Sequence, residues 1–206
     1  MPGFAQGDSG LLGCTATCNA RIAQVELVTK FDGAVAVAAE VMARVSADQL
    51  NLPTPCEEWN VAEVADHIVG GVANLAARLR GEEPTEEAFG PEFLADLAAA
   101  AAATRAACAM PGAIDRRVDT PFGEQPATVL INLRIAELLV HSWDLATATG
   151  QPTDFASELS EQCLTQWRTI LGESARPEPS PIGQPLQAPP HATSADRLAA
   201  FFGRKS

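Results

Sequence analysis

The chain has 206 residues, of which 47% are hydrophobic, and its formal net charge at pH 7 is −12. This length suits one domain or one and a half, with enough apolar side chains for a core. The negative charge argues against nucleic acid, whose phosphates require clusters of Lys and Arg, and against anionic membrane surfaces. We therefore expect neither nucleic acid nor membrane as a partner.

The sequence also indicates a compartment. It has no apolar run of the roughly eighteen residues that a transmembrane helix requires. Its N-terminus lacks the basic stretch and continuous apolar segment of a signal peptide. Five cysteines are scattered along the chain, an odd number that is typical of a reducing environment rather than of a disulfide framework. The predicted location is the cytoplasm.

The first part of the chain is predicted to be a flexible extension over residues 1–21, followed by one helical domain over residues 22–206. The extension is rich in Gly, Ser, Thr and Cys and shows no helical period. Its Cys14 and Cys18 are interpreted as inert or adventitious thiols, because no His or second Cys pair follows at zinc-finger spacing. A first helix is predicted over residues 20–45 from apolar residues at helical spacing.

The second helix has a clear start. Pro53 and Pro55 cannot continue the first helix. Asn60 is a good N-cap, and Glu63 stands where a capping box places its acid. This helix is predicted to stop at Gly81.

The remaining elements complete an all-α fold. Residues 111–126 form a predicted connection with short extended segments, and residues 176–193 a Pro-rich strap. Four further helices are predicted over residues 91–110, 127–149, 154–171 and 194–202. Four long helices with few strand patterns favour a four-helix bundle with extra C-terminal helices.

The helix over residues 127–149 carries an unusual polar stripe. Arg134, Glu137, His141 and Asp144 fall within an arc of about 80°. Leucines lie inside or beside this arc: Leu130, Leu133, Leu138 and Leu145. Charges embedded among leucines must be paired or metal-bound, because unpaired buried charge is costly.

Within the stripe, Glu137 and His141 are at positions i and i+4, so their side chains point to the same spot. Such a pair is a common half-site for a divalent ion between helices of a bundle. The alternatives are an internal salt-bridge stripe or a solvent-exposed face. For Asp144 we consider holding a ligand histidine through its ring N–H. For Arg134 we consider pairing with Glu137 or Asp144, or binding an anionic substrate. A structural ion pair of Arg134 and Asp144 is the alternative.

His67 is the best candidate for a third ligand. It lies on the second helix at the border of an apolar face, where a hydrogen-bonded core histidine is the alternative. Gly70 and Gly71 follow it at a cost of about 1 kcal/mol each against Ala, and leave room for a neighbouring helix or a ligand. His191 lies in the strap and is interpreted as a solvated surface histidine. Two histidines and one carboxylate leave coordination positions open for water or substrate.

Several segments also resemble a known family. TPCEEWNV at residues 54–61, DHIVGG at 66–71 and ELLVHSWDLA at 137–146 resemble the signatures of the mycothiol-dependent maleylpyruvate isomerase N-terminal domain group, in the DinB-like superfamily. The ending, DRL at 196–198 and FFGR at 201–204, looks like the closing segment of its actinobacterial metal-binding branch.

The resemblance implies a DinB-like four-helix bundle with one divalent ion at His67, Glu137 and His141. Zinc is the expected ion, with Ni, Fe or Mn as alternatives, and mycothiol is a candidate co-substrate. Some members use the open metal position to activate the thiol for isomerisation or S-transfer. Residues 176–206 are too few for the C-terminal domain of the full isomerase, so the resemblance does not imply maleylpyruvate as the substrate.

Three functions follow as hypotheses. The first is a metal-dependent transferase or isomerase that activates a low-molecular-weight thiol toward a small molecule, with Arg134 and Asp144 as candidate catalytic residues. The second is a non-catalytic metal-binding or stress-related protein in which the ion joins two helices. The third is a specialised enzyme of secondary metabolism on the same fold. A homodimer is considered as the oligomeric state.

Overall fold

A computed structural model describes residues 9–85, 92–176, 180 and 182–205, with side chains from residue 21 onward. Its long helices are α1 (Ser9–Met42), α2 (Val61–Arg80), α3 (Phe93–Cys108) and α4 (Ala127–Thr149). The shorter elements are a 3₁₀ turn η1 (Ala47–Gln49), the strands β1 (Arg117–Thr120) and β2 (Gly123–Pro126), and the helices α5 (Ser157–Leu171) and α6 (Ser194–Phe201).

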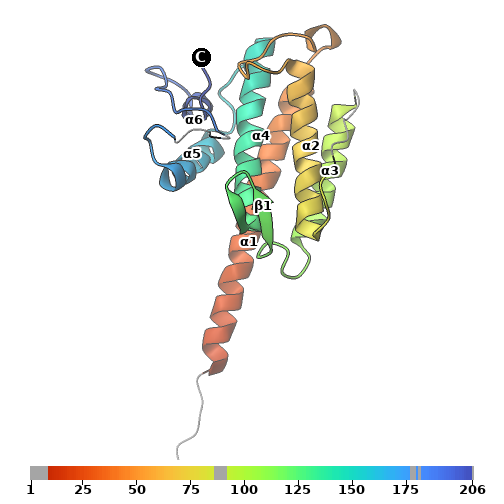
Figure 1. The fold of residues 1–206 in the computed structure, drawn as a ribbon, viewed down its shortest axis with the longest axis vertical. Coiled ribbons are helices and arrows are strands. Elements are labelled where there is room, and N and C mark those ends of the chain that lie inside the picture. The colour runs from red at the N-terminus through yellow and green to blue at the C-terminus, as the bar shows by residue number, and fades with distance from the viewer. Residues whose placement is uncertain (1–8, 86–91, 177–179, 181, 206) are drawn as a thin grey trace, which may run out of the picture.

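The four long helices form the predicted bundle (Figure 1). Helix α1 packs against α3 and α4, and α2 packs against the same two helices. Between them lies one core of buried aliphatic side chains, to which all four helices contribute. The predicted all-α four-helix bundle with extra C-terminal helices is therefore confirmed. The expected extended segments between α3 and α4 are an antiparallel hairpin of β1 and β2.

Helix α1 begins earlier than predicted. It starts at Ser9 rather than near residue 20, so residues 9–21 are helical where we expected a loose extension. The chain has no proline between positions 2 and 53, so nothing interrupts a helix once it is nucleated. In Figure 1 the N-terminal half of α1 projects away from the other helices. Residues 1–8 and the side chains of Cys14 and Cys18 lie outside the described residues, and the separation of a flexible extension stays a prediction.

The predicted ends of α2 and α4 are confirmed. Asn60 Oδ1 accepts a hydrogen bond from Glu63 N at 3.0 Å, and Glu63 Oε2 accepts one from Asn60 N at 2.8 Å. Gly81 and Gly150 follow the two helices with φ of 79° and 71°, the left-handed conformation that glycine adopts without a Cβ penalty. Local capping thus determines where the helices that carry the polar residues begin and end.

The C-terminal part lies on one side of α4 (Figure 1). Helices α5 and α6 pack against each other and against α4. The chain between them is anchored by Arg176, which donates from Nη2 to the Phe201 carbonyl oxygen at 2.7 Å and lies over the Phe201 ring. Across the described residues, none of the helices combines the length and apolar character that a membrane span requires.

Candidate metal centre

The polar stripe of α4 faces the interior of the molecule. His141 is 6% exposed and Asp144 is fully buried, whereas Arg134 and Glu137, nearer the start of the helix, are partly exposed. The four leucines beside the stripe are also buried. The alternative of a solvent-exposed face is therefore wrong, because the rotation of α4 places its charges against the bundle and the C-terminal segment.

Within the stripe, neighbouring residues pair with one another. Arg134 Nη1 lies 2.5 Å from Glu137 Oε2, and His141 Nδ1 lies 3.0 Å from Asp144 Oδ2. The first contact is an ion pair, and among the described residues the buried Glu137 Oε2 has no hydrogen-bond donor. Asp144 does not pair with Arg134. Its charge partner is Arg204, whose Nε lies 2.9 and 3.1 Å from the two carboxylate oxygens.

Two helices bring their histidines to one place. The ring centroids of His67 on α2 and His141 on α4 are 4.9 Å apart, with the rings nearly perpendicular. Trp59, in the loop before α2, lies 4.5 Å from the His67 ring and 5.8 Å from the His141 ring, centroid to centroid. The two imidazoles therefore share a space that an indole ring closes on one side.

This arrangement fits a divalent ion. Two imidazoles that bind one ion through nitrogen at ~2.0–2.1 Å have ring centroids about 5 Å apart at a tetrahedral angle, close to the observed separation. Desolvation, followed by the charges of His141, Arg134 and Arg204, lowers the pKa of His67 to about 3. The ring is thus neutral near pH 7, and its nitrogen lone pair is available.

Glu137, the carboxylate of the predicted metal-ligand set, is paired with Arg134. Among the described residues, the group whose donor atoms all lie within 4.8 Å of one another is Cys56, His141 and Asp144. His67, Glu137 and His141 are not such a group among the described residues. The Glu137 carboxylate contacts Arg134 at 2.5 Å, so holding an ion with the histidines would break that ion pair. The ligand set stays a prediction.

Gly71 explains how Arg134 reaches this position. A Cβ at residue 71 would overlap the Arg134 guanidinium. The missing side chain on α2 therefore makes room for a charged side chain of α4, one turn from His67. The glycine pair predicted room for a neighbouring helix or a ligand. At Gly71, the Arg134 side chain of α4 occupies that room.

The sequence reasoning gave no role to three residues of this centre. Cys56 and Trp59 belong to the TPCEEWNV segment, and Arg204 belongs to the closing FFGR segment. These motifs were the indication that could have identified them. Burial raises the pKa of the Cys56 thiol, while the nearby Arg204 charge opposes that rise.

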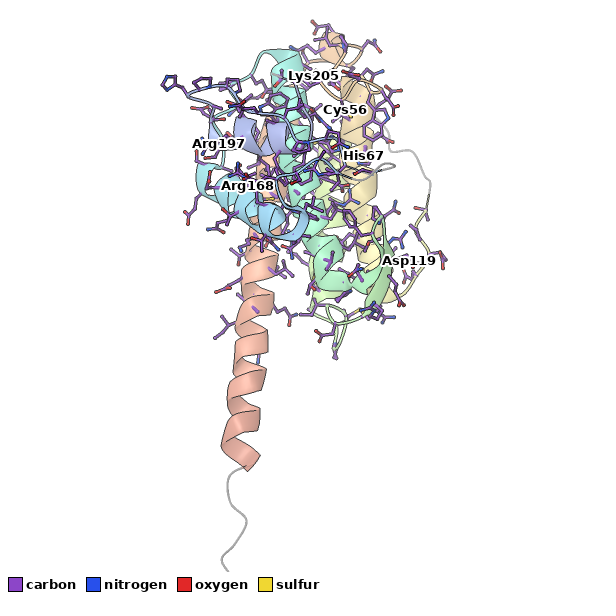
Figure 2. The ribbon with its side chains drawn as sticks, turned by 60° about the vertical axis from the view of Figure 1, so that its left-hand side comes forward. Cys56, His67, Asp119, Arg168, Arg197 and Lys205 are labelled. Carbon is purple, nitrogen blue, oxygen red and sulfur yellow. The ribbon has the colours of Figure 1, made fainter. Side chains whose placement is uncertain are left out.

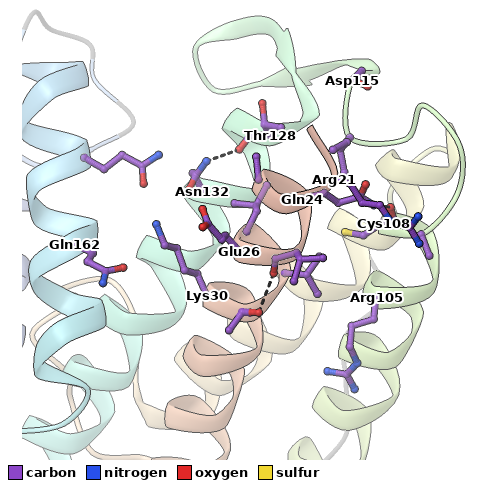
Figure 3. A pocket seen from close by; sticks show the side chains of 18 of the residues that line it. Arg21, Gln24, Glu26, Lys30, Arg105, Cys108, Asp115, Thr128, Asn132 and Gln162 are labelled. Atoms are coloured by element: carbon purple, nitrogen blue, oxygen red, sulfur yellow. Dashed lines mark hydrogen bonds between the residues drawn. The ribbon is translucent and has the colours of Figure 1, made fainter. Parts of the chain in front are cut away.

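A broad pocket lies away from the histidines (Figure 3). It has a volume of about 1780 Å³ and is lined by α1, α5, the C-terminal end of α3 and the start of α4, including Arg21, Lys30 and Gln162. None of the four stripe residues and neither of the paired histidines lines it. His191 in the strap is exposed, as predicted for a surface histidine.

The sequence matches the model of the family described as the mycothiol maleylpyruvate isomerase N-terminal domain over residues 31–146, more than half of the chain. The chain belongs to this family. The matched region contains His67, Glu137 and His141 and ends before α5. Arg204 of this chain therefore lies outside the matched domain.

Individual proteins agree with this assignment. Two uncharacterized proteins of Mycobacterium tuberculosis, from strains CDC 1551 / Oshkosh and ATCC 25618 / H37Rv, are each 40% identical to this chain over 167 residues. The alignment covers 81% of this chain and 91% of theirs. The crystal structure of the mycothiol-dependent maleylpyruvate isomerase superposes with a TM-score of 0.50 at 16% identity, covering 71% of this chain and 72% of the isomerase. A mutant of that enzyme gives the same TM-score. At this identity the likeness shows the fold.

Proposed function

We propose that this protein is a metal-dependent enzyme that activates a low-molecular-weight thiol, mycothiol being the expected one, for isomerisation of or S-transfer to an electrophilic small molecule. The observation that supports it most is the 4.9 Å separation of the His67 and His141 rings, which come from separate helices. His67, Glu137 and His141 would hold the ion. Zinc is the expected ion, with Ni, Fe or Mn as alternatives.

The protein's own residues prepare this site. Asp144 Oδ2 lies 3.0 Å from His141 Nδ1; with the proton on Nδ1 donated to this carboxylate, Nε2 would keep the lone pair that a ligand needs. The neutral His67 ring offers a second nitrogen. When bound, the ion supplies a Lewis acid that deprotonates a coordinated thiol.

Arg134 has a separate role in this proposal. It is 2.5 Å from Glu137 in the structure, and that ion pair opens when Glu137 turns toward the histidines. The guanidinium is then a free cation beside the site. A planar guanidinium binds carboxylates in a bidentate manner, so we assign Arg134 to an anionic group of the substrate.

The first experiment tests metal binding with matched histidine variants. We expect elemental analysis of purified protein to find about one divalent ion per chain, and Co²⁺ titration to give the spectrum of a nitrogen- and oxygen-bound ion. His67→Ala and His141→Ala should each abolish high-affinity binding. His191→Ala is the control, because that exposed residue should leave the metal content unchanged. Equal metal content in all four proteins would contradict the proposal.

Thiol activation needs a second measurement on the same cobalt protein. Addition of mycothiol should produce an intense sulfur-to-cobalt charge-transfer band, because a thiolate enters the open position. The Cys56→Ser variant serves as a control, since it removes the protein's own nearby thiol. An unchanged spectrum at saturating mycothiol would remove thiol activation from the proposed function.

A non-catalytic metal protein is the second candidate. It is favoured by the grouping of Cys56 and Asp144 with His141, donor atoms within 4.8 Å, since a fourth protein ligand would close the coordination sphere. In that case the cobalt protein should already show the sulfur band without added thiol. The band should disappear in Cys56→Ser, and mycothiol should have no effect.

A further inference from the structure

We propose that Arg204 is a positioning residue of the metal centre, acting on His141 through Asp144. This inference rests on the proposed function for its metal-binding part only. Arg204 follows α6 by three residues and is 60 residues from Asp144 in the sequence. Its Nε lies 2.9 Å from Asp144 Oδ1 and 3.1 Å from Oδ2. The same Oδ2 lies 3.0 Å from His141 Nδ1.

The contacts from Arg204 through Asp144 to His141 lie mostly inside the protein, where the pairing of charges matters most. The Asp144 side chain is 0% exposed, and that of Arg204 is 17% exposed. A buried carboxylate without a counter-charge is strongly unfavourable. Arg204 supplies that charge and holds both carboxylate oxygens, so that Oδ2 is placed to accept a hydrogen bond from His141 Nδ1. The Nε2 atom of His141 is then left as the free lone pair.

Loss of Arg204 should release this arrangement. Without the guanidinium on its two oxygens, the Asp144 carboxylate can rotate or take another donor, and its hydrogen bond with His141 Nδ1 is weakened. The imidazole then loses the contact that fixes its tautomer and ring orientation. The Nε2 lone pair is no longer presented to an ion.

Contacts other than the Asp144 pair keep Arg204 in place. Here the C-terminal tail means residues 203–205. Gly203 has φ of 89°, and an added Cβ there would lie 2.9 Å from Gly183 Cα, so the tail crosses the strap at close backbone approach. Lys205 Nζ lies 2.8 Å from Glu57 Oε1, and Figure 2 shows Lys205 and Cys56 at the same end of the molecule. The fold therefore presents Arg204 to Asp144.

Lys205 offers a matched control for Arg204. It is the adjacent residue, it carries the same charge, and it also forms an ion pair across the fold. However, its pair with Glu57 is largely solvent-exposed, with side chains 77% and 76% exposed, and such pairs contribute little to stability. If Arg204 only tethered the C-terminal tail, substitutions of Arg204 and Lys205 should have similar effects on the metal centre.

The first test uses metal-free protein and the ¹⁵N chemical shifts of the histidine rings, assigned with His67→Ala and His141→Ala. In wild type and Lys205→Gln we expect His141 with its proton on Nδ1. In Arg204→Gln we expect loss of that tautomer, and in Arg204→Lys, which keeps the charge, its partial retention. A wild-type tautomer in folded Arg204→Gln would overturn the inference. If Arg204→Gln does not fold, the tautomer is measured in Arg204→Met, which keeps an extended apolar side chain without the charge, and a wild-type tautomer there would overturn the inference as well.

The second test measures Zn²⁺ affinity by competition with a chromophoric chelator. We expect the affinity to fall by about 10–100-fold in Arg204→Gln, the range for loss of a hydrogen-bonded partner of a metal ligand, and to be unchanged in Lys205→Gln. Unchanged affinity in Arg204→Gln, with binding abolished in His141→Ala, would overturn only the role of Arg204. Absence of Zn²⁺ binding in wild type would contradict the proposed function, and the tautomer measurement would still decide the inference.

Discussion

Arg134 is held between two helices. On α4 it faces Glu137 at 2.5 Å, and across the interface its guanidinium occupies the space of a missing Cβ at Gly71. Glycine within a helix costs about 1 kcal/mol relative to alanine. The chain tolerates that cost at Gly71 because no other residue lets the guanidinium approach the α2 backbone.

Gly71→Ala should therefore not give the stabilisation that alanine usually brings to a helix. The new Cβ displaces the flexible end of the Arg134 side chain from Glu137, and the lost ion pair should offset the gain of about 1 kcal/mol in helix propensity. We expect no increase in the free energy of unfolding in urea, measured by circular dichroism.

The matched background for this variant is Arg134→Ala, which removes the obstructing side chain. There, Gly71→Ala should be stabilising by up to about 1 kcal/mol, because only the helix propensity remains. The same effect of Gly71→Ala in both backgrounds would show that the Arg134 contact is unimportant.

At the level of elements, the start of α2 decides where His67 lies. Asn60 caps the helix through the reciprocal bonds with Glu63, and His67 follows two turns later. Thr54 adds a second anchor, since its hydroxyl donates to the Trp59 carbonyl oxygen at 2.7 Å. The loop that carries Cys56 and Trp59 is thus joined to the first turn of the helix that carries His67.

Asn60→Ala should cost about 1 kcal/mol of folding free energy, within the ~0.5–2 kcal/mol known for N-cap substitutions. The reason is that the Glu63 backbone N–H loses its acceptor. Urea denaturation measures the loss. Asn60→Asp is the control, since its carboxylate also caps, and it should remain near wild type; equal losses in both variants would speak against a capping effect.

For the whole molecule, a shared ion would connect α2 and α4, because His67 is on one and His141 on the other. A ligand that binds only the folded state stabilises it by about 2.7 kcal/mol at a free concentration 100 times its Kd. We expect Zn²⁺ to raise the melting temperature and a chelator to lower it again.

His67→Ala should abolish this thermal shift, whereas His191→Ala should retain it. The measurement applies equally to the catalytic and the non-catalytic candidate, since both connect the two helices. A shift that persists in His67→Ala would place the ion elsewhere on the protein.

The positions of the helices after α1, the capping box at Asn60 and the polar stripe of α4 could be read from the sequence. These features depend on residues within a few positions of one another, and helical periodicity makes their consequences predictable. The approach of His67 to His141 was also predictable, because a polar stripe among leucines requires partners from a facing helix. The start of α1 was not, because its Gly-, Ser- and Thr-rich first turns predict a loop, whereas these residues weaken a helix without breaking it.

Only the tertiary structure paired Arg204 with Asp144 and turned Glu137 toward Arg134. The first contact joins residues 60 positions apart, and it depends on how α6 and the strap return to α4. The second depends on the space at Gly71 of another helix. Local sequence limits which side chains can face the interior, but the choice of partner for a buried charge is made by every element packed around it.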